Sequence, residues 1–476
     1  IFQIPMGCSL ALLGAGYMVG LAGGIAILLG IVIAWGVLVP YFSATLPQPA
    51  DVDVATFALT LWKEKVRFIG AGTLGVAAVW TLIMLLKPMA EGMRLSLAAM
   101  RAPQDYQRSR VEQDLSPKAM IGWTLGMLVM LGLSFHHFVD SAAISDTAGW
   151  ILVLLGTLLS FFIGFLVAAA CGYMAGLVGS SSSPISGVGI VSVVIVSLVL
   201  LVYGESAGLF AHEGNRQFML ALTLFVGSAV VSVASVSNDN LQDLKTGWLN
   251  QATPWRQQVA LIIGCVVGAL VIAPVLEMLY QAYGFTGAMP REGMDVKQAL
   301  AAPQATLMTT IATGIFSHNL QWNYIFTGIG IGVALIIVDR LLRSRPGTNL
   351  SLPVLAVGMG IYLPPAVNMP IVIGTVLATL VRKRIQRRHA DRKQAEPYLK
   401  RAERTGTLMA AGLIVGESLM GVIMAFIIAF SVTSGGSDAP LALSLENWDD
   451  AASWLGLAAF VVGATLLVNR VMKAAR

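Results

Sequence analysis

The sequence predicts an all-α, polytopic membrane protein with about ten transmembrane helices and one broken, re-entrant helix pair. The first observation is composition. Of 476 residues, 56% are hydrophobic and 12% are charged, whereas soluble domains carry about 25% charged residues. The second is a series of apolar runs long enough to cross a bilayer. The third is the uncharged stretch 352–381, which has prolines at its centre.

Ten apolar runs are predicted to span the membrane. A helix needs about 20 apolar residues to cross a hydrocarbon core of roughly 30 Å. A shorter Gly-rich piece at 4–19 is expected to be the end of a preceding span. The ten runs are 20–42, 66–86, 120–139, 149–172, 187–204, 216–237, 257–281, 322–341, 406–431 and 452–470.

Residues 352–381 are predicted to form two half-helices that meet inside the membrane. One straight helix of this length would measure about 45 Å at 1.5 Å per residue, which exceeds the hydrocarbon core. Pro364 and Pro365 interrupt the stretch, because proline removes a backbone donor and clashes with the preceding turn. Secondary transporters build substrate and ion sites at such breaks. The alternative is one kinked helix that binds nothing.

Loop charges predict the same reversal through the excess of Lys and Arg in cytoplasmic loops. Segment 87–119 is basic and is placed in the cytoplasm, and counting spans forward puts 342–350 on the same side. Segment 382–404 contains ten Lys and Arg residues, so it is predicted to be a cytoplasmic loop too, solvated beside anionic lipid. Both ends of 352–381 then lie on one side, which a hairpin allows and a single crossing does not.

Segment 297–321 leaves two possibilities open. It is apolar but contains Pro303, Gly314 and His318. It forms either an outer half-helix that dips into the membrane or an amphipathic helix on the surface.

Glu417 is the strongest single candidate for chemistry. It lies near the middle of the apolar run 406–431. A carboxylate at that depth is costly unless it is paired, protonated or in contact with water. Glu417 is therefore expected to carry a coupled proton. The alternative is a protonated side chain that donates a structural hydrogen bond.

Two polar segments on the predicted cytoplasmic side are further candidates. A serine run before Pro184 offers hydroxyls and a helix N-terminus to a carboxylate or phosphate, or it only caps the helix. A second cluster follows the span 216–237 and is either a solvated loop or an inner gate. The residues are Ser180, Ser181, Ser182 and Ser183 in the first segment and Asn238, Asp239, Asp243 and Lys245 in the second.

Several other functions are not supported by the sequence. The three cysteines lie in apolar stretches without zinc-ligand spacing, so neither a disulfide framework nor a metal site is expected. His136 and His137 are adjacent and diverge by about 100° on a helix, which disfavours one shared metal. No phosphate-binding GxxxxGK[ST] motif occurs. The net charge of +5 lies in loops, so nucleic acid is not an expected partner, and no cofactor is expected.

The chain resembles the prokaryotic branch of the oligopeptide transporter family, which includes the yellow-stripe-like metal-chelate transporters. One departure is Ser182, because bacterial members often have Asn within the serine run. Members are also typically longer, with more spans, so the chain is expected to lack the first several. The resemblance rests on GYMAGLVGSSSSPISG (172–187), SNDNLQDLKTG (237–247), TPWRQQ (253–258), LPVLAVGMGIYLP (352–364) and GLIVGESLMGV (412–422).

This resemblance implies proton-coupled uptake of short peptides or metal–chelator complexes across a bacterial cytoplasmic membrane. The expected organisation is one transmembrane domain over 1–476, in a lipid bilayer, with homo-oligomerisation left open. Glu417 would couple the proton, the serine run with Tyr362 and Asn368 would contact substrate, and the 238–245 cluster would form the gate. The rival hypotheses are a membrane-embedded enzyme acting on a lipid-linked substrate and a channel-like subunit.

Overall fold

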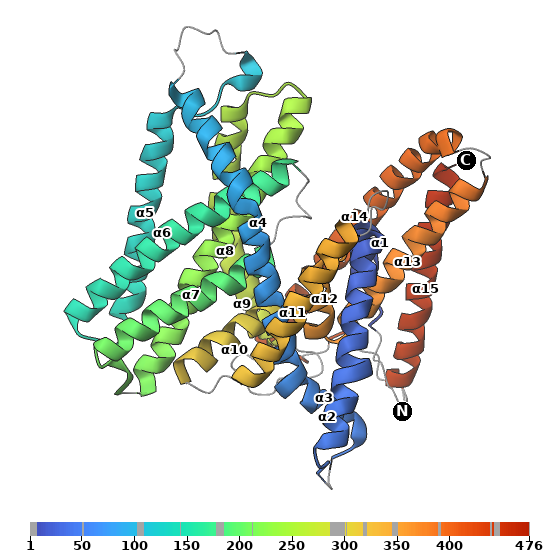
Figure 1. Ribbon diagram of the computed structural model, residues 1–476, viewed down its shortest axis with the longest axis horizontal. Coiled ribbons are helices and arrows are strands. Elements are labelled where there is room, and N and C mark those ends of the chain that lie inside the picture. Colours follow the sequence, from blue (N-terminus) through green and yellow to red (C-terminus); the bar gives the residue numbers. More distant parts are fainter. Residues whose placement is uncertain are drawn as a thin grey trace. The chain divides into compact units, whose positions relative to one another are not determined.

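A computed structural model defines the fold (Figure 1). Within the described residues the secondary structure is helical, apart from one isolated β-bridge between Phe285 and Leu300. The all-α prediction is therefore confirmed. The structure describes residues 7–49, 52–101, 109–142, 144–177, 185–211, 213–285, 300, 302–317, 321–344, 351–388, 392–437, 440–441 and 448–475.

The helices fall into two compact units, and each is described by itself. Unit 1 comprises residues 1–77, 274–301 and 322–476, and unit 2 comprises 78–273 and 302–321. The helices, in chain order, are α1 Leu10–Ile31, α2 Val39–Thr45, α3 Val54–Leu61, α4 Arg67–Arg101, α5 Pro117–Asp140, α6 Asp146–Leu177, α7 Ile185–Ser206, α8 Glu213–Leu249, α9 Pro254–Tyr283, α10 Pro303–Ser317, α11 Trp322–Arg343, α12 Val354–Tyr362, α13 Pro365–Arg388, α14 Arg392–Thr433 and α15 Trp448–Ala474, with π-helical turns at η1 Val32–Leu38 and η2 Trp62–Val66 and short 3₁₀ turns at η3 Arg110–Glu112 and η5 Leu209–Ala211.

Ten helices among the described residues are long and apolar enough to cross a membrane. Nine of them match predicted spans, and the tenth is α13, the longer arm of the predicted hairpin. The remaining predicted span, 66–86, is also helical and lies within α4. The chain is thus a multi-pass α-helical membrane protein.

Two predicted loops are shorter than expected. Residues 238–249 were expected to belong to a loop, but α8 continues to Leu249. Within the basic loop predicted at 382–404, α13 extends to Arg388 and α14 begins at Arg392. Both corrections have one cause, because Lys, Arg, Gln and Leu are good helix formers and allow a helix to continue after its apolar stretch ends.

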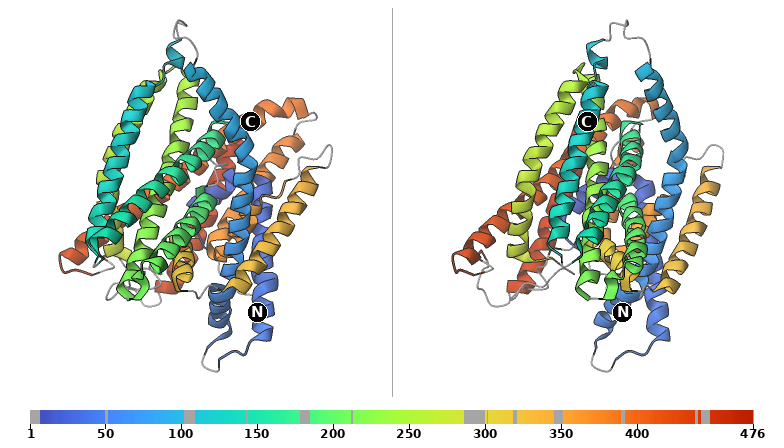
Figure 2. Two further views of the ribbon diagram at one scale, coloured as in Figure 1. Left: turned by 60° about the vertical axis from the view of Figure 1, so that its left-hand side comes forward. Right: turned by 90° about the vertical axis from the view of Figure 1, so that its left-hand side faces the viewer.

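Unit 2 is built around α6, α7 and α8, which pack side by side (Figure 2). Helix α10 packs against α7 and α8, with Met308 facing Gly189 and Phe316 buried near Met219. The guanidinium of Arg216 donates to the main-chain oxygen of Phe316 at 3.1 Å, a favourable contact for the negative end of a helix. This part of segment 297–321 is therefore a helix packed on the helices of unit 2, and its depth in the membrane stays open.

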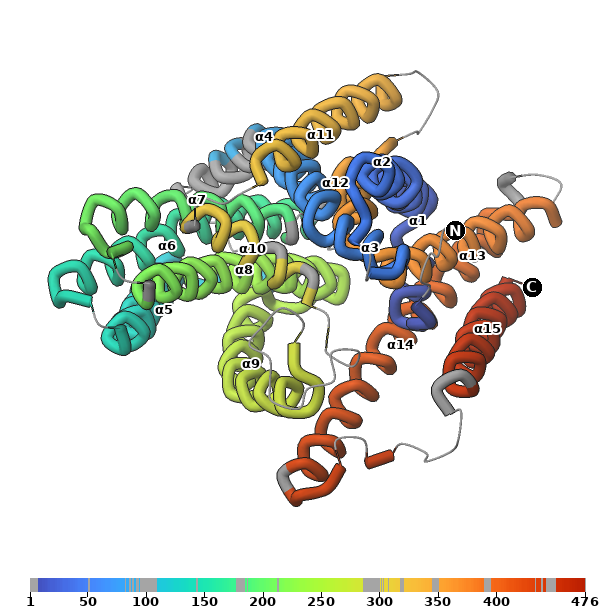
Figure 3. Tube along the Cα trace, turned by 90° about the horizontal axis from the view of Figure 1, so that it is seen from below, coloured from blue at the N-terminus to red at the C-terminus, as the bar shows by residue number. Residues whose placement is uncertain are grey.

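Unit 1 is organised around α1, which has two arms separated by a break at Gly20. The dihedral angles of Gly20 are φ 79° and ψ 167°, a conformation that only glycine adopts readily. Leu13 and Tyr17 of the first arm contact Gly374, and Gly24 of the second arm contacts Thr375. Both arms therefore pack against the same stretch of α13 instead of continuing in line (Figure 3).

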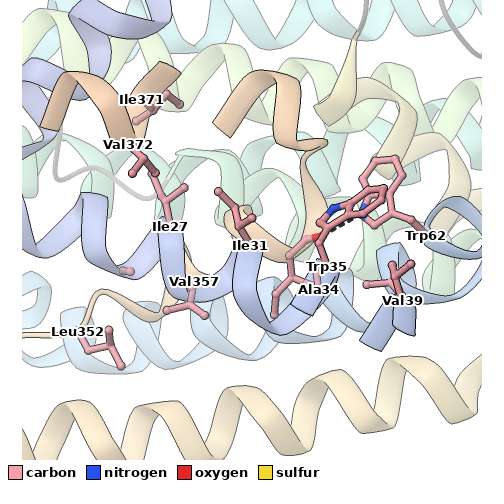
Figure 4. Packing of buried hydrophobic residues seen from close by; sticks show 13 residues of the cluster. Ile27, Ile31, Ala34, Trp35, Val39, Trp62, Leu352, Val357, Ile371 and Val372 are labelled. Carbon is pink, nitrogen blue, oxygen red and sulfur yellow. Dashed lines mark hydrogen bonds between the residues drawn. The ribbon is translucent and has the colours of Figure 1, made fainter. Parts of the chain in front are cut away.

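Close backbone approach holds the second arm of α1 against α12. A Cβ atom at Gly30 would meet the main-chain oxygen of Val357, and one at Gly360 would meet that of Ile27. Small residues allow such contacts between helices in membranes. Beside this crossing lies a buried apolar cluster (Figure 4), whose members include Ile27, Ile31, Ala34, Trp35, Val39, Trp62, Val357, Ile361, Ile371 and Val372.

Candidate functional site

The chain reverses direction between α12 and α13. Leu363 is extended (φ −82°, ψ 147°), and Pro365 begins α13. The side-chain amide of Asn368 donates to the main-chain oxygens of Met359 at 3.4 Å and Gly360 at 3.2 Å. Residues eight or nine positions apart in one straight helix would be separated by about 12–13 Å along its axis. The predicted break within 352–381 is therefore confirmed, and its re-entry on one side of the membrane stays a prediction.

Asn368 closes the end of α12. It is fully buried, and its amide also lies 3.1 Å from the main-chain oxygen of Leu363. The last carbonyl groups of a helix have no helical donor, and this side chain satisfies those of Gly360 and Leu363, whereas Met359 also accepts from the backbone N–H of Leu363. The carbonyl oxygen of the Asn368 side chain has no hydrogen-bond partner among the described residues. The amide thus fixes the tip of the hairpin and leaves one buried acceptor.

The N-terminal segment of the described chain is attached to the same tip. Pro370 lies inside α13 and has no N–H group, so the carbonyl oxygen of Ala366, four residues earlier, lacks its helical donor. The backbone N–H of Gly7 donates to that oxygen at 3.2 Å. A side chain at Gly7 would collide with Ala366. Pro370 therefore creates the acceptor that ties the start of α1 to the hairpin.

Glu417 of α14 binds the N-terminus of α1. One carboxylate oxygen accepts from the hydroxyl of Ser9 at 2.6 Å, and the other accepts from the backbone N–H of Ala11 at 2.8 Å. Ser9 also caps the helix by accepting from the N–H of Leu12. A helix N-terminus carries a partial positive charge that attracts a carboxylate. The exposed Glu417 side chain is thus held by two donors and by the α1 dipole.

A cationic and aromatic cluster surrounds the end of α12. The indole N–H of Trp62 donates to the main-chain oxygen of Ile361 at 3.2 Å (Figure 4). The guanidinium of Arg67 donates to the hydroxyl of Tyr362 at 2.5 Å and lies 4.6 Å from the centre of that ring. Trp35 stacks on Trp62 with ring centres 6.1 Å apart. These contacts join η1, η2 and α4 to the hairpin tip.

Lys65 adds a second cation on the same turn. Its ammonium group donates to the hydroxyl of Tyr324 at 3.0 Å and lies 5.0 Å from the centre of that ring. Phe42 packs edge-on against Tyr324, with ring centres 5.5 Å apart. A tyrosine face attracts a cation but does not neutralise its charge. The Lys65 side chain therefore lies half-buried in an aromatic setting.

The remaining predicted residues are not at this tip. Ser180, Ser181, Ser182 and Ser183 lie outside the described residues. The 238–245 cluster lies on α8 in unit 2, with Asn238 buried and the other three side chains exposed. Lys245 lies 4.7 Å from the ring centre of Trp248. Among the described residues, no group of three or more His, Cys, Asp or Glu side chains is arranged to hold a metal ion.

Five residues of the site were missed by sequence reasoning. The run WKEKVRF at 62–68 carried the signal, because it places three cations beside a predicted span. Lys and Arg near the ends of spans are common, so this pattern did not stand out. Ser9 could have been read as an N-cap, but its pairing with Glu417 depends on folding. The five residues are Ser9, Trp35, Trp62, Lys65 and Arg67.

A set of apolar helices around a broken helix pair defines a multi-pass α-helical membrane protein with a discontinuous element at its site. The chain belongs to the OPT oligopeptide transporter protein family, which matches residues 2–428.

Individual relatives agree with this assignment. A Haemophilus influenzae protein named as an oligopeptide transporter is 56% identical over 473 residues, which cover 99% of this chain and 74% of that protein. A rice protein named as a metal-nicotianamine transporter is 23% identical over 433 residues, or 85% of this chain and 53% of that protein. An Arabidopsis thaliana metal-nicotianamine transporter is 26% identical over 227 residues, or 46% of this chain and 30% of that protein. The chain thus spans about half the length of the rice relative.

Proposed function

We propose that this chain forms the core of a proton-coupled secondary transporter for short peptides or metal–chelator complexes. The membrane would be the bacterial cytoplasmic membrane. Family membership and the names of the relatives support a transporter rather than an enzyme. In this proposal the two units act together as one transporter domain over residues 1–476.

The observation that carries the proposal is the continuous link from Glu417 to the hairpin tip. Glu417 holds Ser9 and Ala11 at the start of α1. Two residues before Ser9, Gly7 donates to Ala366 in the first turn of α13. A carboxylate inside a membrane helix is a functional candidate by default. Here it contacts the half-helix that is attached to the broken element.

Protonation of Glu417 would weaken this link. The neutral acid loses its attraction to the positive end of α1, which is worth about 0.3–1 kcal/mol for an exposed carboxylate at a helix N-terminus. The first arm of α1 then detaches more easily from α14. Because Gly7 bonds to Ala366, that movement reaches the tip of the hairpin. A proton would thereby bias the transporter between two arrangements of one discontinuous element, as alternating access requires.

Substrate contacts are proposed at the tip and at the serine run. Tyr362 is buried with its hydroxyl bound by Arg67, and Asn368 keeps one buried acceptor at the tip. Ser180, Ser181, Ser182 and Ser183 remain proposed contacts from the resemblance. Asn238, Asp239, Asp243 and Lys245 remain a proposed inner gate. The exposed acids at positions 239 and 243 are four residues apart on α8, so they share one helix face.

Uptake by the full chain in proteoliposomes tests the proposal. A pool of short peptides and a nickel–nicotianamine complex serve as probes, each with and without an imposed inward proton gradient. The wild type is expected to accumulate at least one probe against its gradient only when protons drive it. Glu417→Gln is expected to abolish proton-driven accumulation and to retain part of the counterflow exchange.

Glu396→Gln is the matched control, because Glu396 pairs with Lys400 on the surface of the same helix. This variant is expected to transport like the wild type. Proton-driven accumulation by Glu417→Gln at the wild-type rate would refute the coupling role. Rapid equilibration of the probes without accumulation would indicate a channel, and chemical conversion of a probe would indicate an enzyme.

A further inference from the structure

Lys65 and Arg67 are two cations for which the described part of the chain provides no negative partner. Among the described residues, no carboxylate oxygen lies within 4.0 Å of either side chain. Both side chains are half-buried, while the intervening Val66 is fully buried. Glu64, next along the chain, is exposed. Two half-buried cations at the end of a membrane span are unfavourable unless an anion compensates them.

The cluster also contains hydrogen-bond donors that have no acceptor. The Nε–H of Arg67 is buried and has no partner among the described residues. The same is true of the indole N–H of Trp35, whose side chain is only 7% exposed. Buried polar groups in folded proteins are nearly always hydrogen-bonded. Two unsatisfied donors beside two uncompensated cations point to an absent acceptor that is negatively charged.

The backbone around the cluster is irregular on both sides. Trp35 lies in η1, whereas Trp62 and Lys65 lie in η2, and both turns are π-helical. Isolated π-helical turns occur frequently at functional sites. The end of α12, which carries Tyr362, is the third irregular element beside the cluster. Three discontinuities of the helical backbone thus converge on the two cations.

We propose that Lys65 and Arg67 bind a carboxylate group of the transported molecule, with Tyr362 and Trp35 as further contacts. This inference rests on the proposed transport function and specifies its substrate chemistry. Arg67 donates to Tyr362 through one terminal nitrogen, which leaves Nε–H for the ligand. A guanidinium group fits a planar carboxylate through two parallel hydrogen bonds. Lys65, on the same turn, supplies the second positive charge.

A free carboxylate is the feature that the two proposed substrate classes share. Short peptides end in one, and chelators derived from amino acids carry several. Transport would then require that the substrate present an uncompensated carboxylate to the hairpin tip. Blocking that group chemically removes the charge but keeps the rest of the molecule, so it separates this site from all other substrate contacts.

Binding to the purified full chain in lipid nanodiscs tests the inference without transport. The probes are a pool of di-, tri- and tetrapeptides, the same pool amidated at the C-terminus, nickel–nicotianamine, and inorganic phosphate. Mass spectrometry identifies and quantifies the ligands retained by the protein. The wild type is expected to retain the free-acid peptides about thirtyfold or more in preference to their amides, the penalty expected for leaving a buried charge unpaired.

Arg67→Gln is expected to lose this preference. Arg67→Lys is expected to retain part of it, because lysine keeps the positive charge but cannot form the two parallel hydrogen bonds of a guanidinium group. Lys63→Gln is the matched control, since Lys63 lies on the same turn with an exposed side chain. It is expected to bind like the wild type. Melting temperatures of the variants identify any that fail to fold. If Arg67→Gln does not fold, the acid preference of Arg67→Lys is the result that decides.

Three outcomes would overturn the inference while leaving the transport proposal intact. In the first, a wild type that transports the peptides retains acids and amides equally. In the second, folded Arg67→Gln and Arg67→Lys keep the acid preference unchanged. In the third, phosphate displaces the bound peptides more readily than free-acid peptides do. A wild type that neither accumulates nor retains any probe would instead refute the proposed function itself.

Discussion

The carboxylate of Glu417 accepts a hydrogen bond from the hydroxyl of Ser9 at 2.6 Å, across a sequence separation of 408 residues. The two side chains join the middle of α14 to the start of α1. Ser9 also caps its own helix through Leu12. One hydroxyl therefore serves both the start of a half-helix and the carboxylate proposed to carry the proton.

Ser9→Ala should destabilise the protein and impair proton-driven uptake together. Removing an N-cap hydroxyl costs about 1 kcal/mol, and Glu417 loses one of its two donors. Thermal unfolding in detergent and uptake in proteoliposomes measure the two effects. Ser418→Ala is the control, because among the described residues that hydroxyl bonds to Ile414 of its own helix and to no other residue. Equal melting temperatures for the two variants would contradict the capping role.

Thr375→Val should weaken the packing of the two arms of α1 against α13. The Thr375 hydroxyl lies 2.8 Å from the main-chain oxygen of Gly16, four residues before the break at Gly20. A lost buried hydrogen bond costs about 1 kcal/mol. Thr379→Val, one turn further on, removes a hydroxyl whose one hydrogen bond in the described part of the chain stays within α13. We expect a lower melting temperature for the first variant alone, and equal losses would refute this assignment.

Gly360→Ala should destabilise the hairpin strongly. Its Cβ atom would collide with the main-chain oxygen of Ile27, and overpacking of this kind costs about 1–3 kcal/mol or more. Gly330→Ala on α11 places its Cβ atom in open space. The control should be neutral or slightly stabilised, by less than about 1 kcal/mol, since Ala favours helices. Yield of folded protein and melting temperature distinguish the pair, and a stable Gly360→Ala variant would be evidence against this crossing.

Asn368→Leu should lower stability, because the carbonyl groups of Gly360 and Leu363 lose the donor that the Asn368 amide provides. Leaving buried acceptors unsatisfied costs about 1–3 kcal/mol. Asn469→Leu changes an exposed side chain of α15 and serves as the control. Peptide retention measured beside the melting temperature separates two roles. Lost retention at an unchanged melting temperature would mean that Asn368 acts only through substrate contact.

Cysteine labelling tests the reversal of the chain in the membrane. In a chain with Cys8, Cys171 and Cys265 replaced by Ala, single cysteines are introduced as Ser351→Cys, Arg387→Cys and Ser434→Cys. A membrane-impermeant maleimide added to sealed, oriented vesicles should modify the first two from the same face, since they flank the hairpin. It should modify the third from the opposite face, beyond α14. Labelling of positions 351 and 387 from opposite faces would show that residues 352–381 cross the membrane.

Much of the hairpin could be predicted because its cause is local. Pro364 and Pro365 cannot lie within a continuous helix, and the basic residues on both flanks favour one side of the membrane. The separation of 4–19 from 20–42 placed a boundary at Gly20, but the packing of both arms on α13 was not predicted, since glycine is common in membrane helices and does not reveal a partner. The position of the break follows from α13, whose residues 371–375 contact both arms of α1.

Within the candidate site, the importance of Glu417 could be predicted from the sequence, but its partners could not. Its depth in an apolar run marked it as a functional candidate, because burial of a carboxylate is costly wherever the helix packs. Its partners could not be inferred, since Ser9 and Ala11 precede it by about 400 residues and no motif connects them. Arg67 and Lys65 were overlooked for a related reason. A cation at the end of a span is ordinary until its aromatic neighbours and missing counter-charge are known.

The sequence by itself determined that this protein crosses the membrane many times, where the apolar stretches of most of its spans lie, and that one helix breaks at Pro364 and Pro365. These properties depend on hydrophobic length, proline geometry and the placement of charge, which act between near neighbours in the chain. The tertiary structure decided which distant groups meet: Glu417 with α1, Gly7 with Ala366, and Arg67 with Tyr362. Those pairings depend on how helices pack, because a backbone group left free by one break must find its partner on another helix.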